Sequence, residues 1–265
     1  MALAGFLNFQ AMELLLEKVR EKKTGRKGQK QRHTKRMYYL RWTRHERIQH
    51  WLLAGSFIVL VFSGFALEYP ESWWAWPFIT LAPAVDLRGT LHRAAATLNI
   101  ALALYHLLWL IISPRGRGQF RFMILRKQDF RDMLNMLRYN LGKTTQHPRF
   151  GHFTYWEKFE YWALIWGTII MATTGLMLWF ENATLRLVPL KVIELATVIH
   201  LYEAILASLS ILVWHFYFVI FSPAVYPMNF SMITGYLSRE EMLEEHELEL
   251  SFYENTEPIP TNEPR

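Results

Sequence analysis

Cysteine is absent from this chain of 265 residues. The absence excludes disulfides, iron–sulfur clusters held by thiolates, and covalent attachment of c-type haem within the chain. The sequence also contains no phosphate-binding loop and no hydrolytic triad, which argues against nucleotide-dependent and hydrolytic enzymes.

Charged residues are nearly absent from four apolar blocks, although they make up 20% of the chain. The blocks are residues 48–67, 91–112, 161–180 and 195–222. Their only charged residues are Arg93 and Glu203. Each block approaches or exceeds the ~20 residues that cross a bilayer, whereas a soluble protein would have to bury four whole helices in a short chain. We therefore predict an all-α, integral membrane four-helix bundle, formed by a domain over residues 41–237.

Basic residues are concentrated in two of the segments between and before the blocks. Residues 17–47 hold 13 Lys or Arg against three acids, and residues 113–152 hold nine against two. The other two connections hold only one and two basic residues. The positive-inside rule therefore predicts that both termini and the middle loop lie in the cytoplasm.

The two ends of the chain differ in charge. Residues 1–40 form a basic segment in which apolar residues recur at roughly helical spacing, so we expect an N-terminal amphipathic, interfacial helix. A frayed terminus is the alternative, and a signal peptide is not indicated. Residues 238–265 form an acidic tail that we expect to be solvated and partly disordered. Trp73, Trp74 and Trp76, in the first outer connection, indicate an interfacial aromatic belt or a docking surface.

Five histidines lie inside or at the mouth of the apolar blocks: His50, His92, His106, His200 and His215. An ionisable side chain within a bilayer is costly without a partner, so it marks a functional site by default. In the predicted orientation, His92 and His200 lie at the outer depth and the other three lie at the inner depth. The depths are about 21 Å apart at 1.5 Å per helical residue. The pattern predicts two haems stacked across the membrane, bound non-covalently through histidine because cysteine is absent.

The inner depth offers three histidines for two axial positions. Two helices that each supply two ligands, as in the cytochrome b of bc-type complexes, would use His106 with His215. The alternative takes His50 from the first block. Spacing alone leaves both choices open.

Several short stretches agree in order and spacing with a known family. They run from Arg47 to Trp51, from Leu91 to Arg93, and from His200 to His215. In these stretches the chain resembles the cytochrome b (γ) subunits of membrane formate dehydrogenases and related di-haem cytochromes b. Residues 155–162, 214–217 and 226–229 are similar to a branch associated with periplasmic multihaem cytochromes. The likeness covers most of residues 40–250.

The resemblance implies which histidines share a haem. His50 and His215 would bind the inner haem, and His92 and His200 the outer one. His106 has no counterpart in that pattern, so it stays an alternative inner ligand or a part of a quinone pocket.

The resemblance also implies a quinone site near the inner haem, at the start of the third span. There Tyr155, Glu157 and Lys158 offer hydrogen-bonding groups, and a carboxylate can relay protons. Thr154 stands where the family pattern has an asparagine. Glu203, the only acid inside a block, is a candidate propionate partner, proton carrier or outer quinol ligand, with a structural hydrogen bond as the alternative.

These features predict a b-type cytochrome subunit of a respiratory complex in the bacterial inner membrane. It would pass electrons through two haem b groups between menaquinone or ubiquinone and a partner subunit, such as a multihaem cytochrome c or an iron–sulfur protein. A zinc or copper transporter and a non-redox membrane anchor are the alternatives; transport sites usually gather their ligands at one depth. No nucleic-acid partner is expected, because basic segments beside membrane spans suit anionic membrane lipid.

Overall fold

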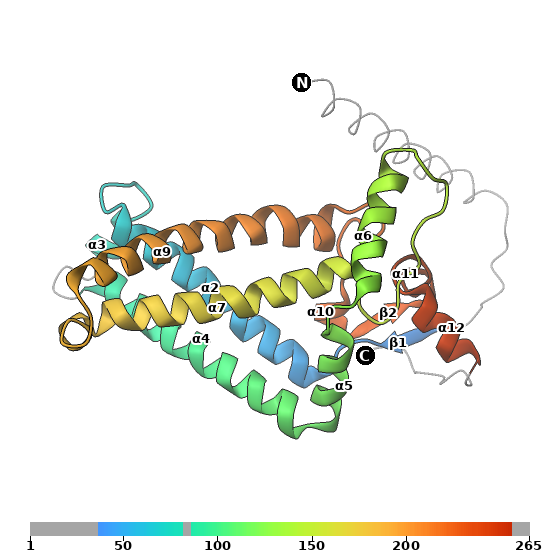
Figure 1. The fold of residues 1–265 in the computed structure, drawn as a ribbon, viewed down its shortest axis with the longest axis horizontal. Helices are drawn as coiled ribbons and strands as arrows, with labels where there is room; N and C mark the ends of the chain where they lie inside the picture. The colour runs from blue at the N-terminus through green and yellow to red at the C-terminus, as the bar shows by residue number, and fades with distance from the viewer. Residues whose placement is uncertain (1–36, 82–85, 256–265) are drawn as a thin grey trace.

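Four long helices lie side by side as a bundle in the computed structural model, which describes residues 37–81 and 86–255 (Figure 1). They are α2 (Arg44–Glu68), α4 (Leu87–Ile112), α7 (Tyr155–Trp179) and α9 (Leu190–Leu209). Each is long and apolar enough to cross a membrane, with the fourth span continuing to Phe221. The predicted all-α four-helix membrane bundle is confirmed. The predicted N-terminal interfacial helix lies outside the described residues.

Large apolar side chains cover the outside of the bundle. Ile58, Leu108 and Trp166 are each more than half exposed, at 54%, 54% and 65%. A water-soluble bundle would bury such side chains in its core, whereas lipid hydrocarbon accepts them. The surface of the spans is therefore that of a membrane protein.

The spans begin earlier than the apolar blocks, and at α2 and α7 the reason is a first turn that contains charged residues but is still helical. At α2, Thr43 and Glu46 form a capping box, and at α7 Thr154 and Glu157 form another. Each box satisfies backbone N–H groups that the first turn leaves without a partner. Hydropathy finds the part of a helix that faces lipid, and the capping residues decide where the helix starts.

The fourth span changes its winding near its end. After α9 it continues as two π-helical segments, η2 (Ser210–His215) and η3 (Tyr217–Phe221). Over 15 residues, an α-helix overshoots whole turns by about 60°. A π-helical turn contains more residues, so each residue advances by a smaller angle. The π segment therefore reduces the overshoot between His200 and His215.

The bundle consists of two hairpins. Helix α2 packs mainly on α4, and α7 packs mainly on α9, while α4 and α7 make the main contact between the hairpins. The interior between these two hairpins is where the histidines of the spans meet.

Short elements gather at one end of the bundle, which we call the cap (Figure 1). The cap comprises β1 (Tyr38–Leu40), α5 (Pro114–Met123), α6 (Lys127–Asn140), α10 (Ser231–Thr234), β2 (Tyr236–Ser238), α11 (Arg239–Glu245) and α12 (Glu247–Asn255). At the opposite end, called the far end, lie α3 (Trp76–Thr80) and α8 (Glu181–Thr184).

The acidic tail differs from the prediction over the part that the structure describes. Strand β2 pairs antiparallel with β1, with Tyr39 opposite Leu237. Met242 and Leu250, from α11 and α12, are buried against these strands. The expectation of a solvated, partly disordered tail therefore does not hold for residues 238–255. The apolar residues that drive this packing are spread among acids, so their mean hydropathy hides them.

Candidate cofactor site in the bundle

The first histidine pair lies toward the far end of the bundle. His92 on α4 and His200 on α9 come from different hairpins, and their ring centres are 6.3 Å apart. We call them the far-end pair. The two rings are inclined by 70°.

A serine hydroxyl orients His92. The Ser63 oxygen lies 3.1 Å from Nδ1 of His92, and the same hydroxyl donates to the Val59 carbonyl at 2.5 Å. Because the hydroxyl proton is used on the carbonyl, its oxygen accepts the Nδ1–H of His92. With the Nδ1 proton held in this way, the neutral imidazole has its lone pair on Nε2, which is the form that binds a metal.

Thr174 orients His200 in the same way from the other hairpin. Its hydroxyl lies 2.8 Å from Nδ1 of His200 and donates to the Ile170 carbonyl at 2.8 Å. Ser63 precedes its histidine by 29 residues and Thr174 by 26. The two hairpins thus repeat one arrangement, which we did not predict from the sequence.

A glycine follows each of these hydroxyl residues and allows the close approach. A Cβ on Gly64 would lie 3.1 Å from Cε1 of His92, and a Cβ on Gly175 would lie 3.1 Å from Cε1 of His200. A side chain at either position would push the imidazole away. The recurring hydroxyl–glycine dipeptide near the end of the first and third spans is the sequence signal for this arrangement.

The second histidine pair lies nearer the cap. His50 on α2 and His215 at the end of η2 have ring centres 6.4 Å apart. We call them the cap-end pair. Nδ1 of His215 lies 3.2 Å from a Glu160 carboxylate oxygen, which accepts a hydrogen bond from the Nδ1–H. Nδ1 of His50 is buried and has no hydrogen-bond partner in the described residues.

His106 has a different environment. Its Nδ1 lies 2.8 Å from the Gln49 side-chain oxygen, and its Nε2 lies 3.2 Å from the Tyr161 hydroxyl. Its ring contacts Trp109 and Tyr161. Both nitrogens are therefore engaged by protein groups, and the structure brings His50, not His106, against His215.

The spacing within each pair fits a single metal ion. Two imidazoles bound through Nε2 to opposite sides of one metal, with bonds of about 2.0 Å, have ring centres about 6.2 Å apart. The observed separations are 6.3 and 6.4 Å. Within the described residues no group of three or more His, Asp or Glu side chains could hold a metal ion. Two axial donors suit a haem, whose porphyrin supplies the other four.

The three residues expected at a quinone site all lie in the first turn of α7. Glu157 accepts hydrogen bonds from Thr154 and pairs with Arg41 at 3.2 Å. Lys158 is buried and pairs with Asp129 on α6 at 2.6 Å. The Tyr155 ring packs among aromatic side chains. Two of the three groups therefore have fixed protein partners.

Glu203 lies on α9, three residues after His200. A Cβ on Gly167 of α7 would lie 2.9 Å from its carboxylate oxygen, so the carboxylate rests on bare α7 backbone. The acid is held between the two helices of one hairpin.

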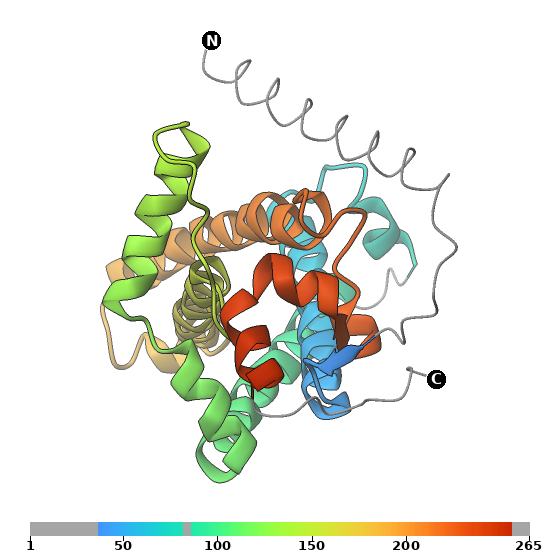
Figure 2. The same cartoon turned by 90° about the vertical axis from the view of Figure 1, so that its right-hand side faces the viewer.

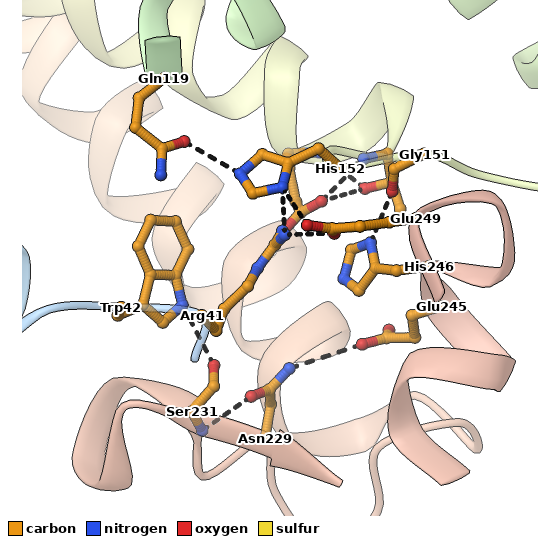
Figure 3. Close-up of polar contacts among 12 residues, drawn as sticks. Arg41, Trp42, Gln119, Gly151, His152, Asn229, Ser231, Glu245, His246 and Glu249 are labelled. Atoms are coloured by element: carbon orange, nitrogen blue, oxygen red, sulfur yellow. Dashed lines mark hydrogen bonds and ion pairs between the residues drawn. The ribbon is translucent and has the colours of Figure 1, made fainter. Parts of the chain in front are cut away.

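A polar cluster joins the cap to the start of α7, and sequence analysis did not find it (Figure 3). Arg41 is only 4% exposed and contacts Glu157 and Glu249 at 3.2 and 3.3 Å. His152 lies 2.6 Å from Glu249 and 3.0 Å from Gln119 on α5. The ion pairs link the residue after β1 to α7 and α12, and the hydrogen bond of His152 to Gln119 adds α5. Because the residues of this cluster are far apart in the sequence, their spacing does not predict that they meet.

Burial shifts two neighbouring groups of the cap in opposite senses. Burial, followed by the nearby Glu157 carboxylate, raises the pKa of Glu245 to about 8. Burial, followed by the charge of Arg41, lowers the pKa of His246 to about 4. Both effects favour the neutral form, so at neutral pH His246 is uncharged and Glu245 largely so.

Comparison with known proteins identifies a family for this chain. The profile of the family described as prokaryotic cytochrome b561 matches residues 41–235, which is well over half of the chain. This range contains His50, His92, His106, His200 and His215. A comparison with curated protein sequences gave no match. The family consists of membrane b-type cytochromes that bind haem b and transfer electrons. With four spans and paired intramembrane histidines, the chain belongs to the prokaryotic cytochrome b561 family and is a multi-pass membrane cytochrome of the b type.

Proposed function

We propose that this cytochrome carries electrons through two haem b groups between the quinone pool and a redox partner. His92 and His200 would bind one haem, and His50 and His215 the other. The observation that carries the proposal is the pair of ring separations, 6.3 and 6.4 Å, at two depths of one bundle. When bound, each haem supplies a one-electron ferric–ferrous couple.

Hydrogen bonds at Nδ1 support this assignment of ligands. Ser63, Thr174 and Glu160 each accept from Nδ1 of one proposed ligand. Such bonds leave Nε2 free and hold the ring in place, as partners of metal-bound histidine usually do. At His50 the Nδ1 position has no partner, so its orientation depends on packing alone.

For His106 we propose a structural role. Its two hydrogen bonds join α4 to Gln49 of α2 and to Tyr161 of α7. It therefore ties three spans together beside the cap-end pair. A side chain that bound iron through Nε2 would have to give up the bond to Tyr161.

We place the quinone site at the start of α7, next to the cap-end haem. Glu160, on the second turn of α7, contacts His215 at 3.2 Å, so a quinone at the start of this helix would lie near the cap-end haem. Tyr155 would donate a hydrogen bond to a quinone oxygen, while Glu157 and Lys158 hold the turn through their ion pairs. Glu203 lies nearer the far-end pair, where we propose that it faces a haem propionate or carries a proton.

The wider setting follows from the charge of the loops and the family resemblance. We propose that the cap lies in the cytoplasm and that the far end faces the periplasm of a bacterial inner membrane. The partner would then meet the far end, as expected for the formate dehydrogenase γ-subunit branch. A multihaem cytochrome c or an iron–sulfur protein could accept or donate the electron there.

Haem content tests the ligand assignment. The purified protein should contain two haem b per chain, measured as the pyridine haemochrome. H92A or H200A should remove one haem, and H50A or H215A should remove the other. H106A should retain both, with a reduced melting temperature. A colourless native protein, or haem loss in H106A but not in H50A, would contradict the proposal; metal without haem would favour the transporter.

A further inference from the structure

Helix α6 lies across the spans instead of along them. Figure 1 shows it nearly perpendicular to the four long helices, and the view down the bundle in Figure 2 shows it at the edge of the bundle, not over its centre. It packs on the first turns of α7, where that span begins. A helix that lies crosswise at the end of a span has the direction expected of an element in the plane of the membrane interface.

One face of α6 is fixed against the protein. Met133 and Met136 pack on the aromatic cluster around Trp156, and Asp129 forms its ion pair with Lys158. At about 100° per residue these three positions share one side of the helix. The remaining faces of α6 are therefore free of this core.

A second face of α6 is an exposed apolar stripe. Phe130, Leu134 and Leu137 recur at i, i+4 and i+7, and Leu141, the C-cap residue, continues the series at i+11. Each of the four is about half exposed, from 48% to 54%. The stripe begins against a span, because the ring of Phe130 lies 5.6 Å from that of Phe159 on α7. The apolar surface of α7 thus continues onto α6.

A row of basic residues borders this stripe. Lys127, Arg131 and Arg138 lie about 70° further round the helix. None of the three has an ion-pair partner among residues 37–81 and 86–255. The two acids of α6 lie outside this row. Asp129 is buried in its pair with Lys158, and Asp132, which accepts a hydrogen bond from Gln128, lies about 120° away around the helix.

We propose that α6 is an interfacial anchor that binds the bilayer surface through anionic lipid headgroups. The stripe inserts between the acyl chains beside α7, and the basic row contacts the phosphates. An apolar stripe with a flanking basic row is the composition of helices that bind anionic membranes. A protein partner would need no such row, and a second copy of the chain would meet the same positive charge.

Single labels on the full-length protein test where the stripe faces. Because the chain has no native cysteine, L137C and the matched control Q128C each carry one environment-sensitive fluorophore. In vesicles, lipids with brominated acyl chains should quench the label at 137 severalfold more than the label at 128. Iodide in the buffer should do the reverse. Strong iodide quenching at 137 would overturn the proposal in favour of water, and protection from both quenchers would overturn it in favour of a protein contact.

Lipid charge tests the basic row. The L137C label is compared in vesicles of phosphatidylcholine alone and of phosphatidylcholine with an equal amount of phosphatidylglycerol. Quenching by brominated lipid should be greater in the anionic vesicles. High salt, or the triple change K127Q, R131Q and R138Q, should remove that difference. Equal quenching in both vesicles would overturn the role of anionic headgroups.

Discussion

At the scale of single residues, the hydroxyls of Ser63 and Thr174 each act as a hydrogen-bond donor and an acceptor at the same time. Each donates its proton to a carbonyl one turn earlier in its own helix and accepts one from a histidine of the next span. A buried Nδ1–H without an acceptor costs about 1–3 kcal/mol. The hydroxyl therefore selects both the orientation and the protonated nitrogen of the ring.

This arrangement predicts the behaviour of T174A and S63A. Loss of the acceptor should make the far-end imidazole a weaker base, which disfavours ferric iron and raises the midpoint potential of one haem. Haem retention should fall by about 10-fold or more, in line with other metal-ligand partners. T174S keeps the hydroxyl and should behave as the native protein. Redox titration followed optically measures the potential; unchanged potentials in both alanine variants would speak against the role.

At the scale of elements, the cap is held to the bundle by buried polar groups. Glu245 shows how burial of such a group can lower the stability of the cap. Its raised pKa of about 8 means that the unfolded cap loses this proton before the folded cap does. The contribution of Glu245 to stability therefore falls as pH rises from about 4.5 to 8. His246, with a pKa of about 4, affects stability in a different pH range. Its burial lowers the stability of the folded cap as pH falls from about 6.5 to 4.

E245Q should therefore stabilise the cap at alkaline pH. A neutral isostere has no charge to bury, so we expect a gain of about 1–2 kcal/mol at pH 8, reduced from the full linkage value by residual solvent contact, and little gain at pH 5. Hydrogen exchange of α11 and α12 amides at the two pH values measures this. E244Q, at the exposed neighbouring position, is the control. An equal effect of both variants would exclude a burial effect at Glu245.

The pair between α6 and α7 allows a structural role of Lys158 to be separated from a quinone role. K158M leaves Asp129 buried without its partner, which should destabilise the protein by about 3–5 kcal/mol. The double variant D129N and K158M removes both charges and should recover most of that loss. Thermal loss of the haem absorbance reports stability.

We also expect quinol to reduce the haems of this double variant at the native rate, because Tyr155 and not Lys158 would contact the quinone. Y155F should slow that reduction by about 10-fold or more while both haems stay bound. A stable double variant that quinol cannot reduce would instead assign Lys158 to the quinone site.

At the scale of the whole molecule, two similar hairpins face each other across the cofactor site, and one end carries almost all of the additional structure. This asymmetry agrees with the charge of the loops. The two hairpins of the bundle thus repeat one arrangement, and the cap makes its two ends different.

Orientation can be measured with single cysteines in living cells. L187C at the far end, where the native side chain is 85% exposed, should react with a membrane-impermeant maleimide added outside. N140C, at the end of α6 in the cap, should react only after the membrane is permeabilised. The reverse pattern would show that the positive-inside assignment is wrong.

Much of this protein could be read from the sequence by itself. Four spans follow from the length of the apolar blocks, because only ~20 apolar residues in a helix cross lipid. The absence of cysteine limits any haem to non-covalent ligation, and the spacing of His50, His92, His106, His200 and His215 predicts ligands at two depths. These conclusions depend on length and side-chain chemistry, which neighbours in the fold do not change.

Only the tertiary structure decided which groups meet. The rotation of each span brings His50 to His215 and turns His106 to Gln49 and Tyr161. The pairing of the tail with β1 and the ion pairs of Arg41 also join distant segments. Helix rotation and long-range pairing depend on packing between spans, and the one-dimensional spacing of residues does not contain that information.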